Sequence, residues 1–355
     1  MEQYVGMDAH KRFSQFAVLD EKGRVIKEVK VEHNNGNIKR YLSGFPQGTQ
    51  VAVECVGNWY WFADEIESAG CEVLLTQAGK AKLMMGHVNK TDKLDAIGLA
   101  KLLRNGTLPT VWLPPGELRD EREIPRTRMK FSRIRTMLKN RIHATFDKYN
   151  IRFEGVSDIF EGEGRKRVLE SRQLLPEETR NCVTRELAVL SEIEKQIKDI
   201  EGRIKAKVKV SEEMKIIDSL PGVAEILAIV IVLETGPIER FPSSENYVSY
   251  CGLVPKVDAS AGRIRYGKLI KAANHYLKWA FVEAAQSVAR CKESAKWRGL
   301  RITELYNKVC SRRGHGKAIV AVARQLAEAA YWMLTKRENY KEPGRKIDAV
   351  IPKSK

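Results

Sequence analysis

Two aspartates one helical turn apart, Asp92 and Asp95, carry the clearest chemical signal in this sequence. Residues three positions apart project from the same face of a helix, so the two carboxylates would lie close together and repel each other. A cation between them removes the repulsion, and hard divalent cations such as Mg²⁺ take oxygen ligands. Taken alone, the pair fits at least as well a solvated helix face on which Lys90 and Lys93 are neighbours.

Two further acids belong to predicted strands. Asp8 ends a strand expected over residues 3–8, where a turn aspartate is the simpler explanation, and Glu54 lies inside an otherwise apolar strand over 51–56. An acid in such a strand costs free energy unless it is paired or bound to metal. A strand-end Asp, a mid-strand Glu and two helical Asp residues, in this order, are the pattern of RNase H-like nucleases, where two Mg²⁺ ions serve phosphodiester chemistry. We therefore expect the four acids to hold Mg²⁺, which Mn²⁺ could replace.

Composition limits the partners of the chain. Its 62 Lys and Arg against 45 Asp and Glu give a formal net charge of +17, which predicts a polyanionic partner. The six cysteines are scattered without a CxxC pair, which argues against a zinc site and a disulfide framework and fits a reducing cytoplasm. No apolar run reaches the ~18 residues of a membrane span, and the N-terminal residues do not resemble a signal peptide.

The N-terminal residues alternate in a way that predicts a mixed sheet. Strands expected over residues 3–8, 13–20 and 24–32 follow one another directly, as in an antiparallel meander. Later strands, over 51–56 and 71–75, alternate with helices near 35–42 and 59–69. This order predicts an α/β domain over residues 1–115, with helices on the faces of the sheet.

From residue 126 the sequence becomes more basic and its apolar residues follow a helical period. Residues 126–150 hold eight Lys or Arg against one Asp, in a helical pattern, and residues 177–208 form a second long helix with heptad-like apolar spacing. The two predict a coiled-coil or helical-hairpin arm over 126–212, with the acidic stretch at 154–163 as a loop at its tip. Basic residues of this arm are candidate nucleic-acid contacts: Arg128, Lys130, Arg133, Arg135 and Lys139.

A mostly helical domain is expected over residues 213–345, followed by a flexible tail over 346–355. Leu220-Pro221-Gly222 separates two helices, which predicts a helix-hairpin-helix element whose backbone N–H groups face a phosphate. Two helices, near 274–290 and 317–335, close the domain around a basic joint. Further candidate nucleic-acid contacts are Arg263, Arg265, Lys268, Lys271, Arg312 and Arg313.

Three acidic blocks of the sequence resemble a known family. Tyr4–His10, the Glu54 strand and Lys90–Ala96 are similar to the RuvC-like domain of the DEDD transposases of bacterial insertion sequences, the insertion-sequence family 110 and its relatives. The C-terminal domain resembles the second domain of that family through these segments: Leu220-Pro221-Gly222, Glu234-Thr235-Gly236, Gly252-Leu253-Val254-Pro255, the loop at Ser260, and Lys271 with Asn274.

The resemblance implies DNA transposition by strand exchange. Ser260 would attack the DNA backbone and become covalently linked to it, although the usual second Ser or Thr and paired glycines are replaced by Ala261, Gly262 and Arg263. A serine hydroxyl needs a base or metal beside it, so we expect Asp8, Glu54, Asp92 and Asp95 to activate Ser260 at one composite site.

The partners implied by the resemblance are donor and target DNA, a structured non-coding guide (bridge) RNA, and further copies of the chain in a dimer or tetramer. The expected location is the bacterial cytoplasm, with association with the nucleoid. Two rival interpretations remain, and each explains only some of these features. One is a RuvC-like junction nuclease that uses water and leaves Ser260 idle. The other is a DNA- or RNA-binding scaffold with a degenerate acidic set.

Overall fold

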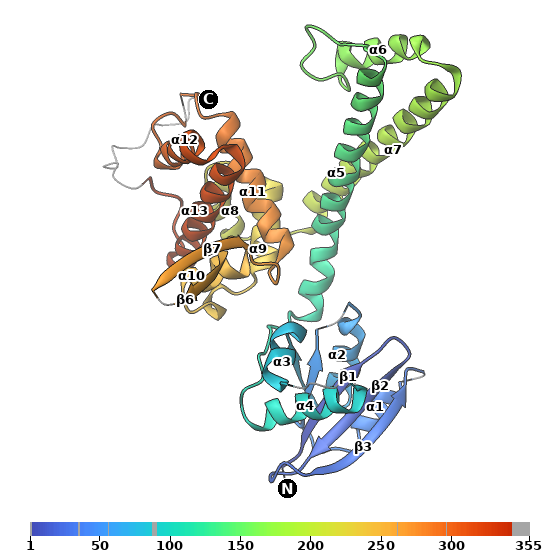
Figure 1. Cartoon of the computed structure of the whole chain (residues 1–355), viewed down its shortest axis with the longest axis vertical. Coiled ribbons are helices and arrows are strands. Elements are labelled where there is room, and N and C mark those ends of the chain that lie inside the picture. Colours follow the sequence, from blue (N-terminus) through green and yellow to red (C-terminus); the bar gives the residue numbers. More distant parts are fainter. Residues whose placement is uncertain are drawn as a thin grey trace. The chain divides into compact units, whose positions relative to one another are not determined.

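Figure 1 shows the computed structural model of the chain, which describes residues 2–34, 36–55, 57–86, 91–260, 262–295 and 297–342. The chain divides into two compact units, Met1–Pro114 and Pro115–Lys355. The predicted tail at 346–355 lies outside the described residues, as do Lys90 and Ala261. Among the helices that the structure describes, none combines the length and apolar character needed to cross a membrane.

The first unit is built on a five-stranded sheet with the order β3-β2-β1-β4-β5. The first three strands form an antiparallel meander, and β4 and β5 run parallel to β1 and to each other. This arrangement confirms the predicted mixed sheet. The strands are β1 (Tyr4–Ala9), β2 (Phe13–Leu19), β3 (Val25–Glu32), β4 (Gln50–Glu54) and β5 (Glu72–Thr76).

Alternate residues of the strands face two different layers of helices. Val5 and Val51 belong to a core shared with α1 (Asn37–Leu42) and α2 (Trp59–Ser68). Ala52, which points to the other face, packs in a separate cluster with α4. The helices on that second face are α3 (Ala78–Met85) and α4 (Asp92–Arg104). The sequence did not predict α3, whose apolar residues Leu83 and Met84 are exposed and therefore follow no buried stripe.

The second unit contains two long helices that pack side by side, α5 (Gly116–Lys148) and α7 (Glu177–Lys207) (Figure 1). The first begins ten residues before the predicted start at 126. Its early turns bury Arg119 and Arg122, and only Leu118 and Ile124 pack there against an apolar cluster, so hydrophobic periodicity does not reveal them. The predicted acidic loop extends to Glu161, and the short helices α6 (Gly162–Ser171) and η1 (Arg172–Leu174) follow it.

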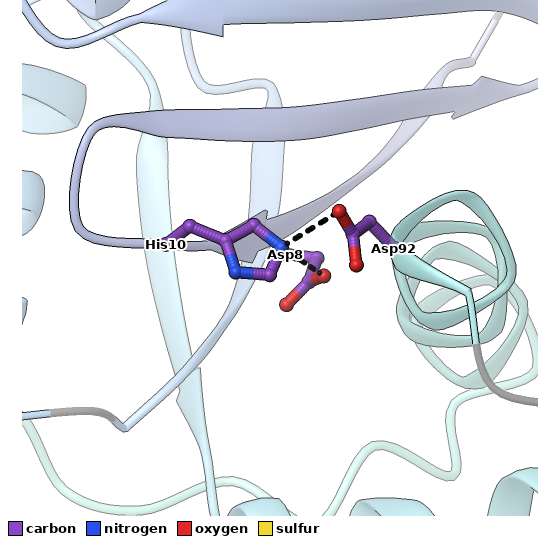
Figure 2. Close-up of side chains that lie close together, drawn as sticks. All are labelled: Asp8, His10 and Asp92. Carbon is purple, nitrogen blue, oxygen red and sulfur yellow. Dashed lines mark ion pairs between the residues drawn. The ribbon is translucent and has the colours of Figure 1, made fainter.

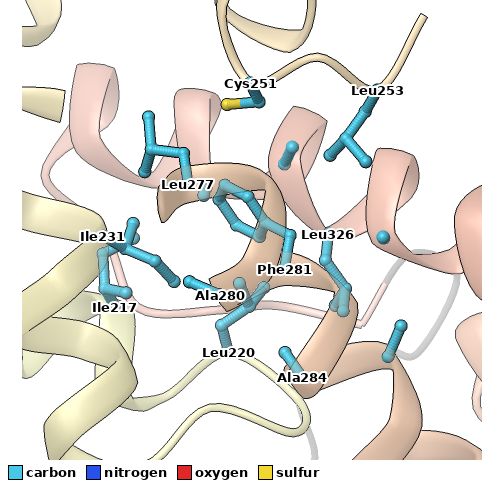
Figure 3. Packing of buried hydrophobic residues seen from close by; sticks show 14 of the residues in the cluster. Ile217, Leu220, Ile231, Cys251, Leu253, Leu277, Ala280, Phe281, Ala284 and Leu326 are labelled. Carbon is cyan, nitrogen blue, oxygen red and sulfur yellow. The ribbon is translucent and has the colours of Figure 1, made fainter. Parts of the chain in front are cut away.

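The remainder of the second unit is mostly helical. Figure 3 shows its core, in which Ile231 of α9, Phe281 of α11 and Leu326 of α13 pack together. Its basic joint contains an unpredicted helix, α12, and the polar segment after residue 254 contains an unpredicted hairpin. The elements are α8 (Glu212–Asp218), α9 (Glu225–Thr235), η2 (Ile238–Arg240), α10 (Ser244–Tyr250), β6 (Pro255–Ser260), β7 (Arg263–Leu269), α11 (His275–Arg290), α12 (Arg301–Arg313) and α13 (His315–Lys336).

Candidate active site

Acids of the first unit lie where the central strands β1 and β4 end. The parallel register pairs Met7 of β1 with Val53 of β4, so the next residues along, Asp8 and Glu54, come to the same edge. Ala52 faces α4, and Glu54 lies two positions further along the strand, so its side chain leaves on that same face. Helix α4 begins at Asp92 on this face. The fold therefore brings residues from distant parts of the sequence to one place.

The most compact group comprises Asp8, His10 and Asp92, whose ligand atoms all lie within 4.8 Å of one another. Figure 2 shows one ring nitrogen of His10 directed at both carboxylates: its Nε2 lies 3.0 Å from Asp8 Oδ2 and 3.2 Å from Asp92 Oδ2. These contacts lack the alignment of hydrogen bonds, and within the described residues Asp8 Oδ2 is a buried oxygen without a hydrogen-bond partner. A buried carboxylate oxygen left in this state fits a cation ligand.

Glu54 and Asp95 do not belong to that compact group. Asp95 nevertheless acts on it through its charge. Burial raises the pKa of Asp8; the neighbouring His10 opposes that rise, and the negative charges of Asp95 and Asp92 add to it. The cluster therefore disfavours its own negative charge, as expected of carboxylates that a metal ion would stabilise.

Sequence reasoning assigned no role to His10. A signal for it exists, because alternate residues of an extended segment share a face, and His10 directly follows β1, two positions after Asp8. Imidazole is also a common metal ligand, so His10 is a candidate for the same site.

The start of α4 fixes where Asp92 lies. Thr91 has an extended backbone, and its hydroxyl accepts a hydrogen bond from the backbone N–H of Leu94 at 3.3 Å. A threonine in this position is a favourable helix N-cap. Asp92 and Asp95 consequently fall in the first turn, where the helix dipole stabilises negative charge.

Gly6 allows α4 to approach β1 closely. A Cβ atom at this position would lie 2.1 Å from the backbone oxygen of Ala96 and 2.6 Å from the backbone nitrogen of Ala100. Both contacts involve backbone atoms, which no side-chain rotation can relieve. The absence of a side chain at Gly6 is therefore what sets the distance between Asp8 and the aspartates of α4.

We expect Gly6→Ala to push α4 away from the sheet. Overpacking of this kind costs typically about 1–3 kcal/mol. Thermal unfolding should show a lower Tm, and calorimetry should show weaker Mg²⁺ binding than in the unchanged protein. Gly79→Ala in α3 is the matched control, since a Cβ there meets nothing within 4 Å. An unchanged Tm and Mg²⁺ affinity in Gly6→Ala would contradict this account.

Ser260 lies at the end of β6 in an exposed hairpin of the second unit. It pairs with Arg263 across the hairpin, and Asp258 pairs with Arg265. Directly opposed residues share a face, so the serine hydroxyl lies on a face with two guanidinium groups. Such a face can hold a phosphate near the serine. The groove at this tip measures about 670 Å³ and is lined by Val257, Asp258, Ala259, Ser260, Arg263 and Arg265.

A buried ionic network links helices of the second unit next to this hairpin. Glu234 of α9 is 1% exposed, and its carboxylate accepts hydrogen bonds from Arg126 at 2.6 and 3.0 Å. Asn274 donates to the same carboxylate at 2.9 Å. The Asn274 oxygen also caps α11 by accepting from the backbone N–H groups of Tyr276 and Leu277. These contacts link α5, α9 and the start of α11, the helix that follows the hairpin in the sequence.

The basic residues predicted to contact nucleic acid occupy two kinds of environment. Arg128 pairs with Glu201 at 2.7 Å, and Lys139 lies 3.5 Å from Asp158 and 3.7 Å from Glu194. These two charges therefore hold the arm together. Arg135 is half-buried, and the others are exposed: Lys130, Arg133, Arg263, Arg265, Lys268, Lys271, Arg312 and Arg313.

Comparison with known proteins assigns both regions to transposases. Residues 5–151, which contain the acidic cluster, match the DEDD transposase family of IS110, and residues 214–298, which contain Ser260, match the transposase family of IS116, IS110 and IS902. The protein is a DNA transposase. Within that class, the chain belongs to the IS110 family of DEDD transposases.

Two individual relatives match along nearly the whole chain, and a third matches a shorter part of it. A transposase for insertion sequence element IS1111A from Coxiella burnetii is 25% identical over 341 residues, covering 95% of this chain and 91% of the relative. A probable family 20 transposase from Pseudomonas aeruginosa is 22% identical over 354 residues, covering 96% and 98%. A transposase for IS1533 from Leptospira borgpetersenii is 32% identical over 106 residues, covering 29% and 31%.

Proposed function

We propose that this transposase exchanges DNA strands at the ends of a bacterial insertion sequence, with Mg²⁺ held by the acidic cluster and Ser260 as the nucleophile. The observation that carries the proposal is the compact group of the buried Asp8, His10 and Asp92, whose ligand atoms lie within 4.8 Å of one another where β1 ends in a mixed sheet. The same placement of acids supports an RNase H-like, RuvC-like fold for the first unit.

In this proposal the metal ligands are Asp8, Glu54, Asp92 and Asp95, with His10 as a neighbouring nitrogen donor. When bound, Mg²⁺ or Mn²⁺ would stabilise the negative charge that develops on phosphate oxygens. The carboxylates orient the cation, and the dipole of α4 offsets part of their mutual repulsion. The raised pKa of Asp8 implies that a proton and a cation compete for the same oxygen.

The proposed reaction of Ser260 is a transesterification. Its Oγ forms a bond to the phosphorus, the bond from phosphorus to one DNA oxygen breaks, and the released strand end takes up a proton as a hydroxyl. One phosphate ester replaces another, so a new strand end can attack the serine ester and rejoin the backbone without a nucleotide cofactor. Arg263 and Arg265 share the face of Ser260 and would neutralise the phosphate during both steps.

The proposed partners rest on charge, architecture and family membership. A net charge of +17 supports binding of a polyanion, which we propose to be donor and target DNA. A structured guide RNA is proposed from the family resemblance alone. The packed pair α5 and α7 supports a helical arm, and we propose a dimer or tetramer. The turn between α8 and α9 supports a helix-hairpin-helix element that offers backbone N–H groups to a phosphate.

The metal requirement is tested by excision of the insertion sequence from a plasmid. We expect Asp95→Asn to reduce excision at least about 100-fold, because several kcal/mol of charge stabilisation would be lost. A chelator should abolish excision, and added Mg²⁺ or Mn²⁺ should restore it. Asp199→Asn, at an exposed position of α7, is the control. Excision that persists in Asp95→Asn without divalent metal would support the nucleic-acid scaffold instead.

A further inference from the structure

A basic groove borders the acidic cluster in the first unit. It measures about 620 Å³ and is formed by the turn between β1 and β2 together with the end of β3. His10 belongs to both features, because its Nε2 contacts Asp8 and Asp92 while its ring lines the groove. The groove is lined by His10, Lys11, Arg12, Phe13, Lys30 and Glu32.

The backbone of this groove is held in place by the sheet. The N–H of His10 donates to the carbonyl of Phe13 at 3.0 Å, and the N–H of His33 donates to the carbonyl of Arg12 at 2.8 Å. Lys30 lies over the ring of Phe13, with Nζ 4.0 Å from the ring centroid. The ring of His10 lies 4.7 Å from that of Phe13. A rigid turn loses little conformational entropy when a ligand binds to it.

The charges of the groove are available to a ligand. Lys11 and Arg12 occupy the exposed centre of the turn, and among the residues that the structure describes neither pairs with a carboxylate. Lys30 adds a third cation, and Glu32 is the single acid that lines the groove. Lysine and arginine together provide a point charge and a fork of donors, a combination suited to phosphate oxygens.

We propose that this groove binds the phosphodiester backbone of the nucleic-acid strand whose reacting phosphate enters the acidic cluster. The inference rests on the proposed function of that cluster. The cluster itself repels a polyanion, so cations beside it must supply the binding energy that holds a strand there. The turn places Lys11 and Arg12 immediately after His10, at the border of the cluster.

The test removes both charges in Lys11→Ala/Arg12→Ala and measures binding in a chelator, so that metal and catalysis play no part. The probes are fluorescent single-stranded DNA and RNA of about 20 nucleotides, longer than the ~16-nucleotide upper site size of single-strand binding folds. Each lost phosphate contact should lower the salt slope of log K by about 0.7. Two lost contacts should therefore weaken binding roughly 25-fold at about 0.1 M salt.

The matched control, Lys22→Ala/Lys101→Ala, also removes two exposed cations from the first unit. Lys22 follows β2 and Lys101 lies near the end of α4, away from the edge that holds Asp8. Its affinity and salt slope should change much less. A Lys11→Ala/Arg12→Ala protein that retains the wild-type slope and affinity would overturn the proposal, whatever the result of the excision assay.

A second measurement places the strand directly, since other basic surfaces of the chain also bind nucleic acid. A photoreactive p-benzoylphenylalanine in place of Glu32 should cross-link to the bound oligonucleotide, and the same residue in place of Lys22 should not. Cross-linking to the DNA probe or to the RNA probe identifies which strand occupies the groove. Cross-links only to other protein copies would overturn the assignment.

Discussion

Ser260→Ala should abolish the covalent adduct between this transposase and DNA. The hydroxyl is the only group of that side chain that can form a phosphate ester, so its removal should lower strand exchange by at least about 10⁴-fold, as loss of a nucleophile does elsewhere. DNA binding should change little, because Arg263 and Arg265 stay in place on the same face. Denaturing gel electrophoresis of labelled DNA would reveal the adduct as a slowly migrating species.

The same experiment separates transposition from hydrolysis. Ser311→Ala, at an exposed position of α12, is the matched control and should retain the adduct. A nuclease that uses water would continue to cut DNA in Ser260→Ala and would never show an adduct. That outcome would favour the RuvC-like junction nuclease and would leave Ser260 without a catalytic role.

Asp8→Asn should stabilise the metal-free protein while removing its response to Mg²⁺. Burial raises the pKa of Asp8, with His10 opposing and the charges of Asp95 and Asp92 adding to the rise, so the ionised carboxylate destabilises the folded state. An amide of the same shape carries no charge. We expect a Tm higher by a few degrees, since ~1 kcal/mol shifts the Tm of a domain of about 100 residues by roughly 4–8 °C.

With Mg²⁺ bound, the unchanged protein should have a higher Tm than Asp8→Asn, the reverse of the order expected without metal. Saturation at about 100 Kd stabilises a binding-competent protein by ~2.7 kcal/mol, and Asp8→Asn should lose most of this gain. Differential scanning calorimetry with and without Mg²⁺ measures both effects. Asp20→Asn is the control of opposite sign. Asp20 accepts hydrogen bonds from the backbone of Lys22 and Arg24 and pairs with the Arg24 guanidinium, so its loss should lower the Tm.

The stability difference should also depend on pH. Because the folded pKa of Asp8 is raised, the folded metal-free protein binds this proton more tightly than the unfolded chain does. The destabilisation is complete above the folded pKa and fades as the pH falls towards the unfolded value of about 3.9. The Tm advantage of Asp8→Asn should therefore shrink on acidification through this window. A Tm advantage of Asp8→Asn that grows on acidification would contradict its proposed origin in the ionised Asp8 carboxylate.

Sequence patterns predicted elements well where apolar residues recur along a strand or a helix stripe. Strands β1, β2 and β3 and the stripe of α7 have this property, and the structure contains them within a few residues of the expected bounds, with β1 and β2 buried along most of their length. Elements stabilised in other ways were missed. The first turns of α5 bury arginines, with Arg122 donating to the backbone carbonyl of Leu233 at 2.8 Å. The hairpin of β6 and β7 buries almost nothing, and Val257, Ile264 and Tyr266 of its apolar face are 52%, 60% and 71% exposed.

By itself, the sequence determined the chemical types in the candidate sites and the family. Acids at a strand end, within a strand and one turn apart on a helix, together with the serine loop, were sufficient because each motif is local. Only the tertiary structure showed that Asp8 and Asp92 meet at His10, that Gly6 sets the approach of α4, and that Lys11 and Arg12 border the cluster. These relations join atoms from β1, β3 and α4, whose distances depend on strand register and helix packing.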